Sequence, residues 1–147
     1  MKIDTWFIVV FIIMWAAGPA TQLLQLLAPK LHMKLGLMES DAFKPEFKWF
    51  LLDERGIAIG DMTFLVSGVA FIWLALLDND TAIIFGLYSC ACYVYFASFS
   101  IPRMLLLSRY DLFPAPKTYS GVFVIYMGAF LLFGLYGLFY LWMLARG

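Results

Sequence analysis

The sequence predicts an all-α integral membrane protein, a four-helix bundle with a short cytoplasmic amphipathic helix between its first and second spans. Of the 147 residues, 64% are hydrophobic and only 14% are charged, whereas soluble domains are about half apolar and about a quarter charged. The chain has 10 basic residues (Lys and Arg) and 10 acidic residues (Asp and Glu). It therefore has no excess of basic charge to form a nucleic-acid-binding face. Aromatic residues make up 19%, which suits a bundle with aromatic belts at both membrane interfaces.

Four apolar segments are long enough to cross a membrane, over residues 6–28, 57–77, 82–107 and 119–145. About 20 residues at about 1.5 Å per residue cover a hydrocarbon core about 30 Å thick. Backbone polar groups in lipid must be paired within the segment, so we expect helices. The first segment stays apolar through Leu23–Leu27, which favours a retained helix over a cleaved signal peptide. We therefore expect one transmembrane domain that comprises the whole chain.

The basic residues predict how these helices are oriented. The loops after the first and third spans carry eight of the ten Lys and Arg residues, and the other end has only Lys2 and Arg146. Because basic loops stay in the cytoplasm, we expect both long loops inside and both termini outside, in a bacterial inner membrane. Trp6, Trp73 and Trp142 fall near the outer ends of their helices, as an interfacial belt of tryptophans would.

The first long loop contains an amphipathic segment, over residues 43–55. One helical face of this segment carries Phe43, Phe47, Phe50 and Leu51, and the charged residues lie on its other faces. Such a helix can lie along the inner leaflet of the membrane with its apolar face in the lipid. It can equally pack as a lid on the inner mouth of the bundle, and the sequence leaves both arrangements open.

The third segment ends in Ser98-Phe-Ser-Ile-Pro-Arg-Met-Leu-Leu-Leu-Ser-Arg109, where a charged residue lies within an apolar run. Either Pro102 ends the helix, or the helix kinks there and continues to Leu107, which embeds Arg103 by about one turn. Asp61, four residues inside the second span, is the only acidic residue within any predicted span. Because ionised groups in lipid need partners, we expect an Asp61–Arg103 ion pair, with either a structural role or a role toward a substrate or proton.

Further polar side chains fall at the same level of the bundle. Gln22, Gln25 and His32 share one stripe of the first segment, and Ser100 shares the helix face of Arg103. These groups can line a polar pocket that opens toward the cytoplasm, or they can join helices by hydrogen bonds. A single His without a companion His or Cys gives no reason to expect a metal, and no catalytic residue or cofactor is indicated. The candidate binding cluster is Gln22, Gln25, His32, Asp61, Ser100 and Arg103.

Small residues predict close helix contacts, either within the chain or between subunits. A G-x-x-x-G pair begins near the second span, one glycine shares the face of Asp61, and four more lie on the fourth span. These residues are Gly56, Gly60, Gly68, Gly121, Gly128, Gly134 and Gly137.

Several different short motifs lie near the ends of the predicted helices: Leu27-Ala-Pro29, Leu35-Gly-Leu37, Glu54-Arg-Gly56 with Gly60, and Arg103 with Arg109. With these motifs the layout resembles the small DoxX-like four-helix membrane proteins. The resemblance implies an accessory membrane subunit or a protein that handles a small molecule, in some cases linked to quinone-dependent redox complexes. It implies no catalytic residues, and Asp61 and the aromatic loop segment fall outside it.

Three hypotheses for function follow. The first is a non-enzymatic membrane protein, either an accessory subunit or a binder of a lipid-like or quinone-like molecule. The second is a transporter or channel subunit with a gate formed by Asp61 and Arg103. The third is a membrane enzyme that acts on an apolar substrate through Gln22, Asp61 and Arg103. The expected partners are the bilayer, an apolar small molecule, and further copies of the chain or a larger membrane complex.

Overall fold

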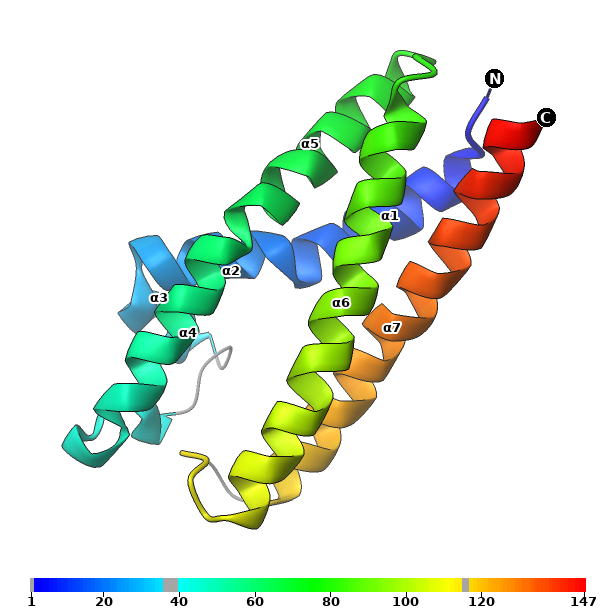
Figure 1. Cartoon of the computed structure of the whole chain (residues 1–147). Helices are drawn as coiled ribbons and strands as arrows, with labels where there is room; N and C mark the ends of the chain where they lie inside the picture. Colours follow the sequence, from blue (N-terminus) through cyan, green and yellow to red (C-terminus); the bar gives the residue numbers. More distant parts are fainter. Residues whose placement is uncertain (1, 36–39, 115–116) are drawn as a thin grey trace.

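The fold, taken from a computed structural model that describes residues 2–35, 40–114 and 117–147, is all-helical in those ranges (Figure 1). Within them, four helical segments are long and apolar enough to cross a membrane: Thr5–Leu27, Pro45–Leu76, Ala82–Arg109 and Gly121–Arg146. The all-α class and the four long apolar helices are therefore confirmed. Three of the segments begin and end within a few residues of the predicted spans, and the second begins well before residue 57.

The first apolar segment is interrupted twice. It forms three helices, α1 (Thr5–Ala17), α2 (Pro19–Leu27) and α3 (Pro29–Lys34). Pro19 and Pro29 each occupy the first position of a helix. Proline suits that position because no hydrogen bond is required of its nitrogen there, whereas inside a helix its ring meets the carbonyl four residues earlier. The structure thus differs from the single helix expected over 6–28 by a break at Gly18.

The second apolar segment is longer than expected. Two short 3-10 turns, η1 (Ser40–Phe43) and η2 (Pro45–Phe47), precede α4 (Lys48–Gly60) and α5 (Met62–Leu76). Asp61 joins α4 to α5 with near-helical angles, φ −72° and ψ −7°. Its N–H donates to the Ile57 carbonyl and its carbonyl accepts from the Leu65 N–H, both at 2.9 Å. In Figure 1, α4 continues the line of α5. An interfacial helix over 43–55 stays a prediction, and residues 48–55 are the first half of α4.

Phe50, on the aromatic side of α4, packs inward. Only 2% of it is exposed, and it forms a small core with Ala42, Met104 and Phe113. The rings of Phe50 and Phe113 meet edge to face at 5.7 Å. The Phe50 side chain therefore contacts other parts of the chain.

The last two helices, α6 (Ala82–Arg109) and α7 (Lys117–Arg146), lie side by side along most of their length (Figure 1). α6 runs through Pro102, so the helix continues past the proline. Both termini and the turn between α5 and α6 lie at one end of the molecule, here called the terminus end. The chain around η1 and η2 and the chain after α6 lie at the other, the loop end. This relative arrangement matches the hairpin layout predicted for the four spans.

An aromatic core joins α1, α5, α6 and α7. Phe7, Phe11, Phe71 and Tyr93 are fully buried in it, and Phe130 stacks on Tyr93 with ring centroids 5.3 Å apart. Toward the loop end, beyond the Gly18 break, a cavity lies between the first segment and α7. That region contains the candidate site.

Candidate functional site

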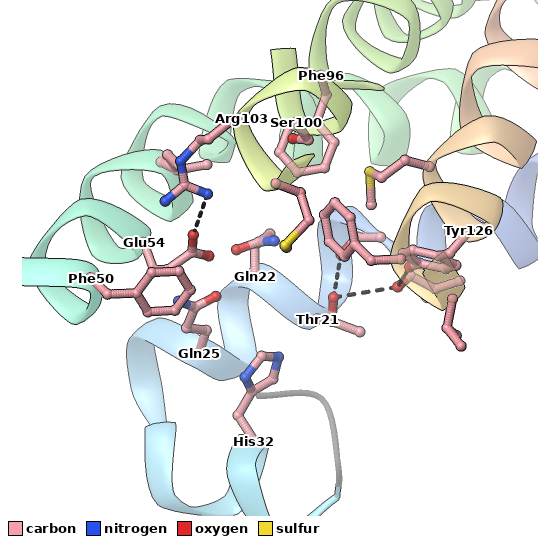
Figure 2. A pocket seen from close by; sticks show the side chains of 17 residues that line it. Thr21, Gln22, Gln25, His32, Phe50, Glu54, Phe96, Ser100, Arg103 and Tyr126 are labelled. Carbon is pink, nitrogen blue, oxygen red and sulfur yellow. Dashed lines mark hydrogen bonds and ion pairs between the residues drawn. The ribbon is translucent and has the colours of Figure 1, made fainter. Parts of the chain in front are cut away.

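A cavity of about 420 Å³ lies toward the loop end, among α2, α3, α4, α6 and α7. It is here called the loop-end cavity, and Figure 2 shows Arg103, Glu54 and Gln25 close together on one side of it and Tyr126 on the other. The structure brings five of the six candidate residues to its wall: Gln22, Gln25, His32, Ser100 and Arg103. Thr21, Glu54 and Tyr126 add polar groups that were not part of the candidate cluster.

The breaks in the first segment position the three N-terminal residues of this cluster. Gln22 and Gln25 lie one turn apart on α2, and α3 places His32 on the same cavity. Gln22 Oε1, Gln25 Nε2 and His32 Nδ1 are buried and have no hydrogen-bond partner. Burial lowers the pKa of His32 below its ordinary value of 6.5, which favours the neutral imidazole. The stripe expected from a continuous helix is thus formed by two helices.

Arg103 forms its ion pairs with α4. Its guanidinium bonds Glu54 Oε1 at 2.8 Å and also the carboxylate of Asp53, and it lies over the Phe50 ring, 5.6 Å from the centroid. The expected Asp61–Arg103 pair is therefore wrong, because Asp53 and Glu54 take the place assigned to Asp61. In Figure 2 the guanidinium faces the Glu54 carboxylate beside Gln25.

The reason is a difference in depth along the hairpin. Counted from the turn near Asn79, Arg103 lies about 24 residues along α6 and Asp61 about 18 residues along α5, a difference of about 9 Å at 1.5 Å per residue. Asp53 and Glu54 lie about 25 to 26 residues from the same turn, level with Arg103. The number of residues from the turn therefore identifies Asp53 and Glu54 as the partners of Arg103. The depth below the presumed inner end at residue 57 does not.

Asp61 lines a separate groove between α4–α5 and α6, here called the Asp61 groove, with a volume of about 620 Å³. Thr63 and Tyr88 are also in its wall, and the Tyr88 hydroxyl donates to Thr63 Oγ1 at 3.4 Å. Ile57 and Phe96 line both the groove and the loop-end cavity, so they form the partition between them. In the described residues no ion pair joins Asp61.

The remaining walls of the loop-end cavity are apolar and adaptable. Phe96, Met104, Phe123 and Met127 line it, and aromatic and thioether side chains accommodate irregular apolar shapes. On α7 the rim residue Val122 is 65% exposed. The cavity therefore opens at the side of the bundle, along α7.

Tyr126 marks the edge of the cavity nearer the terminus end. Its hydroxyl donates to the carbonyl of Ala17, the last residue of α1, and both residues line the cavity. This hydrogen bond ties α7 to the first segment immediately before the Gly18 break. An arrangement with one polar side, apolar walls and a lateral opening is suited to an amphiphilic molecule.

No protein-family model, curated protein or solved structure matches this chain. Function is therefore inferred from the geometry of the site itself. In the part of the chain that the structure describes, no three His, Cys, Asp or Glu side chains are placed to hold a metal ion.

Proposed function

We propose that this chain is an integral membrane protein that binds an apolar small molecule with a polar head, lipid-like or quinone-like, in the loop-end cavity. It would act as a binding protein or as an accessory subunit of a membrane complex. Four helices of suitable length and apolar composition support the membrane location. The excess of basic residues in the two long loops supports a cytoplasmic loop end, with both termini outside a bacterial inner membrane.

The observation that carries the proposal is the division of the cavity into an unsatisfied polar side and an apolar side. Buried polar atoms in proteins are nearly always hydrogen-bonded, and a buried polar atom without a partner is unfavourable. Three such atoms belong to residues of one cavity, on Gln22, Gln25 and His32. A volume of about 420 Å³ lies within the range of about 300–1,000 Å³ that is typical of small-molecule sites. A bound polar head would supply the missing hydrogen bonds.

The transport and enzyme hypotheses receive less support. Both relied on Asp61 acting together with Arg103, and the structure places Asp61 in a different depression, behind Ile57 and Phe96. Glu54 and Asp53 also already neutralise Arg103. The DoxX-like resemblance agrees with a binding or accessory role, and it stays a proposal.

Native mass spectrometry of the protein purified in mild detergent tests the proposal. We expect the wild-type protein to retain a small apolar molecule, and Ser100→Phe, which fills the cavity from α6, to lose it. Ser98→Phe is the matched control, because Ser98 is an exposed residue on the same helix. Gln25→Leu provides a second test if Ser100→Phe does not fold. An empty wild-type protein, or retention by both cavity variants equal to that of the wild type, would contradict the proposal.

A further inference from the structure

The charges on the wall of the loop-end cavity are already balanced. Apart from His32, Arg103 is the only basic residue among the cavity-lining residues that the structure describes, and Glu54 is the only acidic one. The two are bonded to each other at 2.8 Å, and Asp53 holds Arg103 from outside the cavity. An anionic head placed here would meet two carboxylates around one guanidinium. A cationic head would have to compete with Arg103 for Glu54.

The unsatisfied groups of the cavity are uncharged. Gln25 is 2% exposed and His32 is 4% exposed, and each has a polar atom without a partner, as does Gln22. An amide offers one acceptor oxygen and one donor nitrogen whichever way it is turned. Because burial lowers the pKa of His32, its imidazole adds no positive charge to the cavity at neutral pH. The cavity thus presents both donors and acceptors without a net charge that would recruit an ion.

We propose that the loop-end cavity selects an amphiphile with an uncharged, hydrogen-bonding head, a hydroxyl or a carbonyl, and discriminates against charged heads of either sign. This inference rests on the proposed function and specifies its ligand class. A hydroxyl donates to one amide oxygen and accepts from one amide or imidazole N–H, so it satisfies Gln22 together with Gln25 or His32. The chain of the ligand lies against the Phe and Met side chains of α6 and α7.

A matched series of twelve-carbon amphiphiles tests the selectivity. The wild-type protein in nanodiscs is titrated with dodecan-1-ol, dodecanoate and dodecylamine, and bound ligand is counted by native mass spectrometry. Ser100→Phe is titrated in parallel, so that partition into the lipid is subtracted. We expect dodecan-1-ol to bind at a concentration at least tenfold lower than either charged analogue.

Two variants test the physical cause. Glu54→Gln removes the carboxylate that faces the cavity and leaves Arg103 less neutralised. The ratio of the binding concentration of dodecanoate to that of dodecan-1-ol should therefore fall at least threefold. Gln25→Leu removes a buried donor. It should raise the concentration at which dodecan-1-ol binds at least fivefold and change binding of the charged analogues little. An unchanged selectivity in both variants would overturn the assignment of these residues.

The outcomes separate the two proposals. If no amphiphile binds above the Ser100→Phe background, the proposed function itself fails. If amphiphiles bind but a charged one binds as tightly as dodecan-1-ol, the binding role stands and the selectivity for an uncharged head is overturned.

Discussion

At the scale of single residues, Arg103 joins α6 to α4. Its guanidinium pairs with Glu54 and Asp53 and lies over the Phe50 ring. The five N–H groups of a guanidinium can bond two carboxylates at once, which an ammonium group does with less directionality. The same contacts fix the polar side of the loop-end cavity, so this ion cluster contributes both to stability and to the shape of the site.

Glu54→Gln should destabilise the protein, whereas Asp61→Asn should not. Removing one partner of a buried ion pair costs about 3–5 kcal/mol. We expect a smaller loss here, about 1–3 kcal/mol, because Asp53 remains beside Arg103. For Asp61→Asn we expect a change within about 0.5 kcal/mol, since no ion pair joins Asp61 in the described residues. The measurement is the free energy of unfolding in mixtures of mild detergent and dodecyl sulfate, followed by circular dichroism. A larger loss for Asp61→Asn than for Glu54→Gln would contradict the assigned pairing.

The candidate site could be predicted from the sequence only in part. Gln22, Gln25 and His32 were found because polar residues at helical spacing stand out in an apolar segment, and Ser100 shares a helix face with Arg103. Glu54 was missed as a partner of Arg103 because it precedes the predicted second span and was assigned to the amphipathic segment over residues 43–55. Hydropathy marks where a helix becomes apolar, but it does not mark where the helix begins.

At the scale of elements, glycines have two different surroundings. A Cβ added at Gly134 would lie 2.8 Å from the Cys90 carbonyl oxygen, and one at Gly137 would lie 2.4 Å from the Cys90 sulfur. These two glycines therefore allow α7 to approach the backbone of α6. Around Gly56 and Gly60 an added Cβ would meet no atom within 4 Å. The predicted packing role is thus confirmed for Gly134 and Gly137, whereas an added Cβ at Gly121, at Gly128 or in the G-x-x-x-G pair of α4 would meet no atom within 4 Å in the described chain.

The same substitution should therefore have opposite effects at Gly134 and Gly56. Gly134→Ala should lower the free energy of unfolding by about 1–3 kcal/mol, since the new methyl group meets backbone that can move only with α6. Gly56→Ala should raise it by up to about 1 kcal/mol, because alanine is the better residue in a helix and the space is open. The two variants are compared by the unfolding measurement used for Glu54. Equal effects at both positions would show that helix propensity, and not the space around the glycine, decides the outcome.

The sequence also predicted the helices better than their interruptions. Length and apolar composition placed the four long segments, because a membrane core demands both. The break at Gly18 escaped prediction, since Pro19 lies inside a segment that is mostly apolar on both sides and long enough to be one helix. Proline can kink a membrane helix or begin a new one. The choice depends on contacts with other helices, here the approach of Gly18 to Phe130, which an added Cβ would meet at 2.9 Å.

At the scale of the whole molecule, the two ends differ in charge and in aromatic content. The loop end carries eight of the ten Lys and Arg residues. The terminus end carries Trp6 at the start of α1, Trp73 near the end of α5 and Trp142 near the end of α7, all exposed at their surfaces. Exposed tryptophans at one level are typical of a membrane interface. The loop-end cavity, with its lateral opening, would then face the cytoplasmic half of the bilayer.

This orientation predicts which residues a membrane-impermeant thiol reagent can reach. In a background with Cys90→Ala and Cys92→Ala, a cysteine at Asp80 should be labelled in intact spheroplasts, because it lies in the turn at the terminus end. A cysteine at Glu46, exposed between η1 and α4, should be labelled only after the membrane is permeabilised. The physical reason is that basic loops remain on the cytoplasmic side during insertion.

A second variant tests that the basic loops are the cause of the orientation. Adding lysines at Asp78 and Asn79, in the turn that has no basic residue, should increase the fraction of molecules inserted with the turn inside. In intact spheroplasts, labelling of the cysteine introduced at Asp80 should then fall, and labelling of the cysteine introduced at Glu46 should rise. If Glu46 is labelled from outside in the original background, the loop-end cavity faces the outer leaflet. The polar groups of Gln22, Gln25 and His32 would then meet ligands from that side of the membrane.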